Sequence, residues 1–251
     1  MNNSFTPSVE APAIQFSHVT KCIDQKTILD DVCFKVRAGE TLAIAGVNGA
    51  GKTTLLRCLL DFMKVSSGRV EIFGVASTLA SARMPLAFLP ERFVPPGYLT
   101  GHETLVWLAG LRGQTWSEAA SRQGFADFAI DPQAMHRPLK FFSKGMTQKI
   151  GLMACLILQA PLVVLDEPMS GLDPLARRFF TTALKQAKAQ GRTIVFTSHS
   201  MLDIETLCDR MALIHNGALI FCGTPVALRQ RFSGASLEEA FIHSIEPLEH
   251  A

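Results

Sequence analysis

The loop formed by residues 46–54 carries the residue types that hold a phosphate chain. Its sequence follows the pattern G-x-x-x-x-G-K-[ST], whose glycines let backbone N–H groups turn toward an anion. Lys52 is expected to reach the β- and γ-phosphates of a nucleotide and to serve catalysis there, and the Thr53 hydroxyl is expected to ligate Mg²⁺. The other loop residues expected to contact the nucleotide are Asn48, Gly49, Ala50, Gly51 and Thr54.

A second motif supplies the acids that such chemistry needs. Residues 162–165 form an apolar run of the kind found in buried strands, and Asp166 and Glu167 follow it directly. Asp166 is expected to hold Mg²⁺ through water, as a second metal-binding residue beside Thr53. Glu167 is expected to orient the attacking water or to take its proton.

Both motifs need buried elements to position them. Residues 41–45, before the glycine loop, form a short apolar run suited to a buried strand, and residues 54–60 after it read as a helix. The N-terminus of that helix adds partial positive charge near the phosphates. In an open α/β sheet, ligands bind at the carboxyl ends of the strands, where both motifs lie. The sequence therefore predicts an α/β nucleotide-binding fold.

Local signals outline the remaining elements. Residues 14–34 read as two strands joined by a polar turn at residues 24–26, and residues 68–74 read as an edge strand. Helices are expected after a capping box at Thr100 and Glu103, after Ser117, after Asp173, over residues 199–207 and over residues 237–241. Gly191 closes the helix that follows Asp173, and Asn216 and Gly217 mark a hairpin turn between two short strands.

Three further motifs lie in the second half of the chain. Residues 142–146 read Phe-Ser-Lys-Gly-Met before a helix, residues 170–173 read Ser-Gly-Leu-Asp, and residues 197–199 read Thr-Ser-His after a strand. In this order, they resemble the signature motif, the D-loop and the switch histidine of the ATP-binding-cassette (ABC) family. The phosphate loop and the acidic strand end described above complete the set of five motifs that carry this resemblance. The common form of that signature is Leu-Ser-Gly-Gly-Gln. The resemblance covers residues 14–241, nearly the whole chain.

The resemblance implies a fold and a division of the chain. It implies a P-loop NTPase of the ABC cassette type, with a RecA-like α/β core, an antiparallel β piece and an inserted helical lobe. Residues 14–90 and 159–251 would form the ATP-binding core, and residues 91–158 the lobe that carries the signature. Residues 1–13 are expected to be a disordered lead.

The resemblance also implies a composite site. Ser143 and Gly145 would contact the γ-phosphate of an ATP bound by another subunit, so two chains would close head-to-tail around two Mg-ATP. His199 would contact the γ-phosphate and act with Glu167 in catalysis, and Asp173 would couple the two sites across the interface. The residues leave open whether this dimer is a homodimer or a heterodimer.

Several positions depart from the common family pattern. Glu91 stands where a metal-associated Gln is usual, and the signature has Lys144 and Met146 in place of Gly and Gln. These departures resemble the branch of two-component ABC-2-type exporters, whose ATPase and membrane chains are separate. Lys144 is expected either to face a partner's γ-phosphate or to lie in solvent. Ile23 stands where an aromatic ring usually stacks on adenine, and it offers dispersion without a π-face.

The branch resemblance implies a partner and a location. The partner would be an integral membrane permease, and the chain would lie on the cytoplasmic face of the membrane, attached through that permease. The surface that contacts the permease is expected at residues 92–98, which combine Phe93 and Tyr98 with two prolines in a rigid apolar loop.

Composition restricts the alternatives. The 251 residues are 48% hydrophobic, enough for a sizeable core, and the net charge of +2 argues against a strongly electrostatic nucleic-acid binder. No apolar run approaches the roughly 18 residues of a spanning helix, and residues 1–5 lack the features of a signal peptide. The six cysteines form no C-x-x-C pair and are expected to be buried free thiols.

Two other functions remain open from the residues. A soluble ABC-type ATPase could act in DNA repair, in cofactor or complex assembly, or in translation, although repair enzymes carry long coiled coils and translation factors fuse two cassettes. This chain has one cassette and no heptad repeats. A small-molecule P-loop kinase would have no use for a signature or a D-loop.

Overall fold

The computed structural model describes residues 11–157 and 159–249, and ten strands of these residues form one mixed sheet. The strand order is β5-β4-β1-β2-β10-β9-β3-β8-β7-β6. The strands paired in parallel on one side of the sheet are β3 (Thr41–Ala45), β6 (Leu86–Leu89), β7 (Leu162–Leu165), β8 (Thr193–Ser198) and β9 (Arg210–His215). The antiparallel piece consists of β1 (Ile14–Ile23), β2 (Lys26–Val36), β4 (Ser67–Ile72) and β5 (Val75–Ala76).

Strand β10 (Ala218–Gly223) joins the two parts of the sheet. It pairs antiparallel with β9 and parallel with β2, through Ala218 opposite Asp30. Because β5 pairs with the outer side of β4, the expectation that residues 68–74 form an edge strand is wrong.

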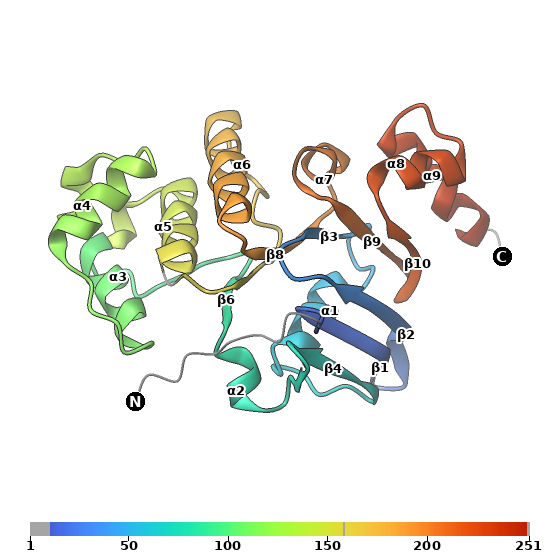
Figure 1. Ribbon diagram of the computed structural model, residues 1–251. Coiled ribbons are helices and arrows are strands. Elements are labelled where there is room, and N and C mark those ends of the chain that lie inside the picture. Colours follow the sequence, from blue (N-terminus) through green and yellow to red (C-terminus); the bar gives the residue numbers. More distant parts are fainter. Residues whose placement is uncertain (1–10, 158, 250–251) are drawn as a thin grey trace.

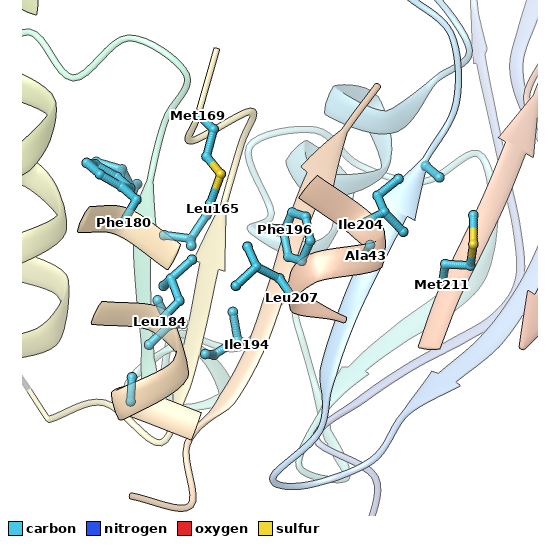
Figure 2. Close-up of a cluster of buried hydrophobic side chains, with 14 of the residues drawn as sticks. Ala43, Leu165, Met169, Phe180, Leu184, Ile194, Phe196, Ile204, Leu207 and Met211 are labelled. Carbon is cyan, nitrogen blue, oxygen red and sulfur yellow. The ribbon is translucent and has the colours of Figure 1, made fainter. Parts of the chain in front are cut away.

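Strands β3, β7 and β8 are apolar because both of their faces are buried. Side chains alternate between the faces of a strand, so Leu42 and Ile44 lie in one core cluster while Ala43 and Ala45 lie in the other. Helix α1 (Lys52–Leu59) covers the first face, and α6 (Pro174–Ala189) and α7 (Met201–Leu207) cover the second (Figure 1). Figure 2 shows the second cluster, in which strand and helix side chains face one another across the layer.

A group of helices lies at the β6 end of the sheet (Figure 1). It comprises α3 (Gly101–Gly110), α4 (Glu118–Asp127), the 3₁₀ helices η1 (Pro132–His136) and η2 (Leu139–Phe141), and α5 (Lys144–Ile157). These helices have their own core around Phe125, Met135 and Met153. The expected capping box of α3 is confirmed, since Thr100 Oγ1 accepts from the Glu103 N–H and the Glu103 carboxylate accepts from the Thr100 N–H.

The C-terminal third contains the expected hairpin. Asn216 and Gly217 connect β9 and β10 with φ of +47° and +81°, as a tight two-residue turn requires. The segment that follows was only partly expected. Helix α8 (Pro225–Phe232) was not predicted, and α9 (Leu237–Glu249) is longer than the predicted residues 237–241. The short helix α2 (Ala80–Arg83) was not predicted either.

Most of the expected N-terminal lead, residues 1–10, lies outside the described residues. Ala13, within the described part, is fully buried and its carbonyl accepts from the Phe73 N–H at 3.0 Å. Within residues 11–157 and 159–249, no helix is long and apolar enough to cross a membrane. The cysteines are free thiols as expected, but Cys22 and Cys33 are exposed and not buried.

Candidate functional site

The phosphate loop sits between the carboxyl end of β3 and the start of α1, as the motif predicts. Gly51 is the N-cap of α1 with φ of +108°, and a Cβ there would lie 2.9 Å from the Leu29 side chain. A Cβ on Gly46 would lie 2.3 Å from the Ile214 carbonyl oxygen, a contact that no side chain tolerates. The loop is therefore shaped by conformations and close contacts that only glycine permits.

Lys52 is buried under this loop. Its ammonium donates to the Gly46 carbonyl at 2.8 Å and to the Val47 carbonyl at 3.1 Å. Lys52 Nζ also lies 3.4 Å from Glu167 Oε1, so the phosphate loop and the acidic end of β7 meet. These contacts place one positive charge where phosphate oxygens approach the loop.

Asp166 lies behind the cavity and joins three elements. Its Oδ1 accepts from the Thr197 hydroxyl at 2.7 Å and from the Thr53 hydroxyl at 3.4 Å. Burial raises the pKa of Asp166 above its ordinary value, while the Thr197 and Thr53 hydrogen bonds lower it and the charges of Glu167 and Glu91 raise it. A cation at this point would favour the ionised carboxylate.

Glu167 stands in a strained and well-connected position. Its φ of +44° is unusual for a residue with a side chain, and its N–H donates to Thr197 Oγ1 at 2.7 Å. Oε2 lies 3.0 Å from His199 Nδ1. Oε1 is buried and accepts no hydrogen bond from the described residues, although Lys52 Nζ is nearby at 3.4 Å. The carboxylate is thus held by its neighbours with one oxygen left to accept a proton or a hydrogen bond.

These groups surround a cavity of about 290 Å³ at the carboxyl ends of the parallel strands. It brings together most of the residues that the sequence predicted for the nucleotide. Its lining comprises Ile28, Asn48, Gly49, Gly51, Lys52, Thr53, Thr54, Glu91, Glu167, Ser170 and His199. The donor set near Asp166 consists of hydroxyl and carboxylate oxygens, which suits Mg²⁺ held jointly with phosphates and water. Among the described residues, no cluster of three or more His, Cys, Asp or Glu is arranged to hold a metal ion.

Other predicted site residues are not among those that line this cavity. Ile23 is 39% exposed at the end of β1, and Ile28, not Ile23, lines the cavity. Ala50 is buried, and its carbonyl accepts from the Gly217 N–H at 3.0 Å. Asp173 is exposed and caps α6 by accepting from the Ala176 N–H at 2.8 Å.

The signature residues also lie outside the cavity lining. Ser143 is exposed, and its hydroxyl accepts from the Met146 N–H at 3.2 Å, as a residue capping α5 would. Gly145 follows it in the first turn of α5. Lys144 Nζ donates to the Ser170 carbonyl at 3.2 Å, so this side chain contacts the D-loop of its own chain. Neither of the two expectations for Lys144 included that contact.

Thr197, to which the motifs of the sequence assign no role, contacts both acids at the end of β7. It is fully buried and bonds both to Asp166 and to the Glu167 backbone. The pairing of β7 with β8 indicates these contacts, because the two strands are parallel neighbours with Leu165 opposite Phe196. One residue further along, Asp166 and Thr197 must be neighbours as well.

A second, apolar cavity of about 410 Å³ lies beside the loop after Glu91. Phe93, Val94, Pro95, Leu139 and Phe142 line it together with the cations Arg92, Lys140 and Lys144. Within residues 92–98, Val94 and Tyr98 are 82% and 77% exposed. Phe93 is only partly exposed and packs against both cores beside it, so its position is that of a structural residue.

Residues 29–170 match the family model described as ABC transporter. The chain is 29% identical over 248 residues to the linearmycin resistance ATP-binding protein LnrL of Bacillus subtilis (strain 168), covering 94% of this chain and 80% of that protein. It is 31% identical over 245 residues to the Nod factor export ATP-binding protein I of Sinorhizobium fredii (strain NBRC 101917 / NGR234), covering 96% of this chain and 71% of that protein.

A solved structure described as the ATP-binding subunit of an ABC transporter superposes on the chain with a TM-score of 0.85. The two are 30% identical, and the match covers 93% of this chain and 100% of that one. This likeness and the mixed sheet confirm the expected ABC-cassette fold. The chain therefore belongs to the ABC transporter family, as an ATP-binding subunit with ATPase activity.

Proposed function

We propose that this chain is the ATP-hydrolysing subunit of an ABC exporter, in which two such subunits close around two Mg-ATP and drive a separate membrane-spanning permease. The observation that carries the proposal is the Glu167 carboxylate, which lies between Lys52 and His199 at the nucleotide cavity. Export is supported by the relative named for Nod factor export and by the one named for linearmycin resistance.

Hydrolysis follows from the geometry of these side chains. The phosphate loop and Lys52 hold the β- and γ-phosphates, and the Glu167 carboxylate accepts a proton from a water. The water oxygen bonds to the γ-phosphorus, and the bond from that phosphorus to the β–γ bridging oxygen breaks, which yields ADP and inorganic phosphate. His199 holds the second carboxylate oxygen and orients Glu167 toward the water.

Thr53 and Asp166 are the residues that would hold Mg²⁺, with Glu91 on the same cavity. When bound, the ion supplies charge compensation for the phosphate oxygens. Thr197 keeps the Asp166 carboxylate turned toward Thr53.

A dimer is supported by the place of the signature. Ser143 and Gly145 are not among the residues that line the cavity of their own chain. Ser143 stands exposed at the N-terminus of α5, and its hydroxyl accepts from the Met146 N–H, so the hydroxyl hydrogen can still be donated. The helix end and this hydroxyl suit a phosphate from outside the chain. A second subunit, identical or related, would therefore complete each site.

The apolar cavity beside residues 92–97 is the surface that we assign to the permease. A lining of aromatic, aliphatic and cationic side chains fits a short amphipathic segment of a membrane protein. Attached there, the chain lies on the cytoplasmic face of the membrane. A soluble ABC-type ATPase in complex assembly is the alternative, and it would leave this surface without a membrane partner.

Glu167→Gln tests the proposal. We expect the variant to bind Mg-ATP and to form an ATP-dependent dimer, measured by light scattering, while turnover falls by about two orders of magnitude or more. Glu71→Gln, on strand β4 away from the cavity, is the matched control and should hydrolyse ATP normally.

Membranes that contain the permease should retain the wild-type chain. Near-normal turnover of Glu167→Gln would contradict its assigned role, and purely soluble partners would favour the alternative.

A further inference from the structure

An ion pair joins two helices that begin beside the catalytic carboxylate. Arg177 Nη1 of α6 lies 2.9 Å from Asp203 Oδ1 of α7. The Asp203 side chain is only 7% exposed and that of Arg177 is 34% exposed. This pair lies away from the phosphate loop, and no step of the hydrolysis described above uses it.

Each partner is anchored in the first turn of its helix. Arg177 follows the D-loop, and its N–H donates to the carbonyl of Asp173, the capping residue of α6, at 2.9 Å. Asp203 follows the switch histidine, and its N–H donates to the side chain of Ser200, the capping residue of α7. Ser200 in turn donates its N–H to Ser198 Oγ at 3.0 Å, so His199 lies in a short braced turn.

Both loops also contact Glu167. The Ser170 N–H donates to the Glu167 carbonyl at 3.0 Å, and His199 Nδ1 lies 3.0 Å from Glu167 Oε2. A small cavity of about 80 Å³ lies between these groups, and Glu167, Ser170, Arg177, His199 and Asp203 all line it. The ion pair and the side chains that line this cavity therefore form a continuous set of contacts from the D-loop to His199.

We propose that Arg177 and Asp203 are positioning residues that couple the D-loop to the His199–Glu167 contact. When the D-loop moves, the ion pair carries the first turn of α7 with it and sets the distance from His199 to Glu167. The proposal rests on the proposed hydrolytic role of Glu167 and extends it to two residues that do not line the nucleotide cavity.

The test separates positioning from stability. Removal of Arg177 alone leaves the Asp203 carboxylate buried and unpaired, which destabilises the fold. The double variant Arg177→Met with Asp203→Asn leaves no such charge and should keep the melting temperature near that of the wild type. We expect its kcat to fall about tenfold while its KM for ATP stays within about twofold, because the phosphate contacts are unchanged. The single variant Arg177→Lys keeps a cation opposite Asp203 and should retain most of the wild-type turnover.

The matched control uses another ion pair of the same helix. Arg229 Nη1 lies 3.7 Å from Glu205 Oε1 of α7, with both side chains more exposed and neither lining the small cavity. Arg229→Met should leave kcat unchanged. In a His199→Ala background, the Arg177→Met and Asp203→Asn pair should cause no further loss of turnover, since it acts through His199.

Two results would overturn the coupling. One is a folded double variant with wild-type kcat, and the other is an equal tenfold loss with and without His199. A wild-type chain that does not hydrolyse ATP would instead refute the proposed function itself.

Discussion

The Thr197 hydroxyl donates to Asp166 Oδ1 and accepts from the Glu167 N–H, both at 2.7 Å. One side chain on β8 thus fixes the two acids at the end of β7. It also explains how Glu167 holds a φ of +44°, because the bond to its N–H anchors the strained backbone.

Thr197→Val should therefore weaken both stability and turnover. Valine keeps the shape but removes the hydrogen bond to the Asp166 oxygen and leaves the Glu167 N–H without its acceptor, at a cost of about 1–3 kcal/mol in the free energy of unfolding. Turnover should fall about tenfold, measured as kcat at saturating ATP. Thr197→Ser keeps the hydroxyl and should recover most of both. Wild-type stability and turnover in Thr197→Val would contradict the role given to the hydroxyl.

Asp166→Asn should abolish ATP hydrolysis and raise the stability of the nucleotide-free fold. Burial raises the pKa of Asp166 above 3.8, so ionisation of this carboxyl destabilises the folded state. The whole penalty is present when the pH is above the folded-state pKa, and it disappears when the pH is well below 3.8. The nucleotide-free variant should melt at a higher temperature than the wild type at pH 7. This difference should shrink as the pH falls through the raised pKa. Mg-dependent hydrolysis should be lost, and a variant that melts lower at pH 7 would contradict the expectation.

The loop after Glu91 offers a matched pair of substitutions. Tyr98→Ser should loosen co-purification of the membrane partner while basal ATP hydrolysis survives, because Tyr98 is 77% exposed. Phe93→Ser should instead lower the melting temperature, since Phe93 packs against both neighbouring cores and lies in the way of any side chain at Gly151. Retention of the partner by a folded Tyr98→Ser chain would show that the surface contacted by the permease does not extend from the cavity to Tyr98.

Two substitutions on the antiparallel piece can show which residue contacts the adenine base. If Ile23 contacts adenine, Ile23→Tyr should tighten ATP binding relative to inorganic triphosphate, since stacking on an aromatic ring is worth roughly 1–3 kcal/mol. Ile28 lines the cavity whereas Ile23 is 39% exposed, so Ile28→Tyr is the companion variant. Affinities for ATP and GTP, measured by titration calorimetry, distinguish them. A gain for Ile28→Tyr alone would move the base contact from Ile23 to Ile28.

The parts of the fold that could be predicted carry strong local signals. Strands β3 and β7 are buried on both faces and so read as unbroken apolar runs. The capping box at Thr100 and the turn at Asn216 each depend on a few adjacent residues, and both are present. The phosphate loop is equally local, since its residues are contiguous and run from the end of β3 into the first turn of α1.

The parts that escaped prediction depend on distant or weak patterns. Helix α8 buries only Leu228 fully and carries Arg229 and Arg231, so it lacks a clear apolar periodicity. The Thr197 contacts join residues about thirty positions apart and become visible only from the register of β7 against β8. The Lys144 bond to the Ser170 carbonyl likewise joins two motifs that are separate in the sequence.

Strand β3, which leads into the phosphate loop, pairs on its two sides with β8 and β9. Both partners come from residues 193–215, far along the chain. During synthesis from the N-terminus, the loop therefore emerges long before the strands that hold it in the sheet. Nascent chains that end before β9 should fail to retain ATP, and the ribosome-bound protein should gain nucleotide affinity only in a late step of folding.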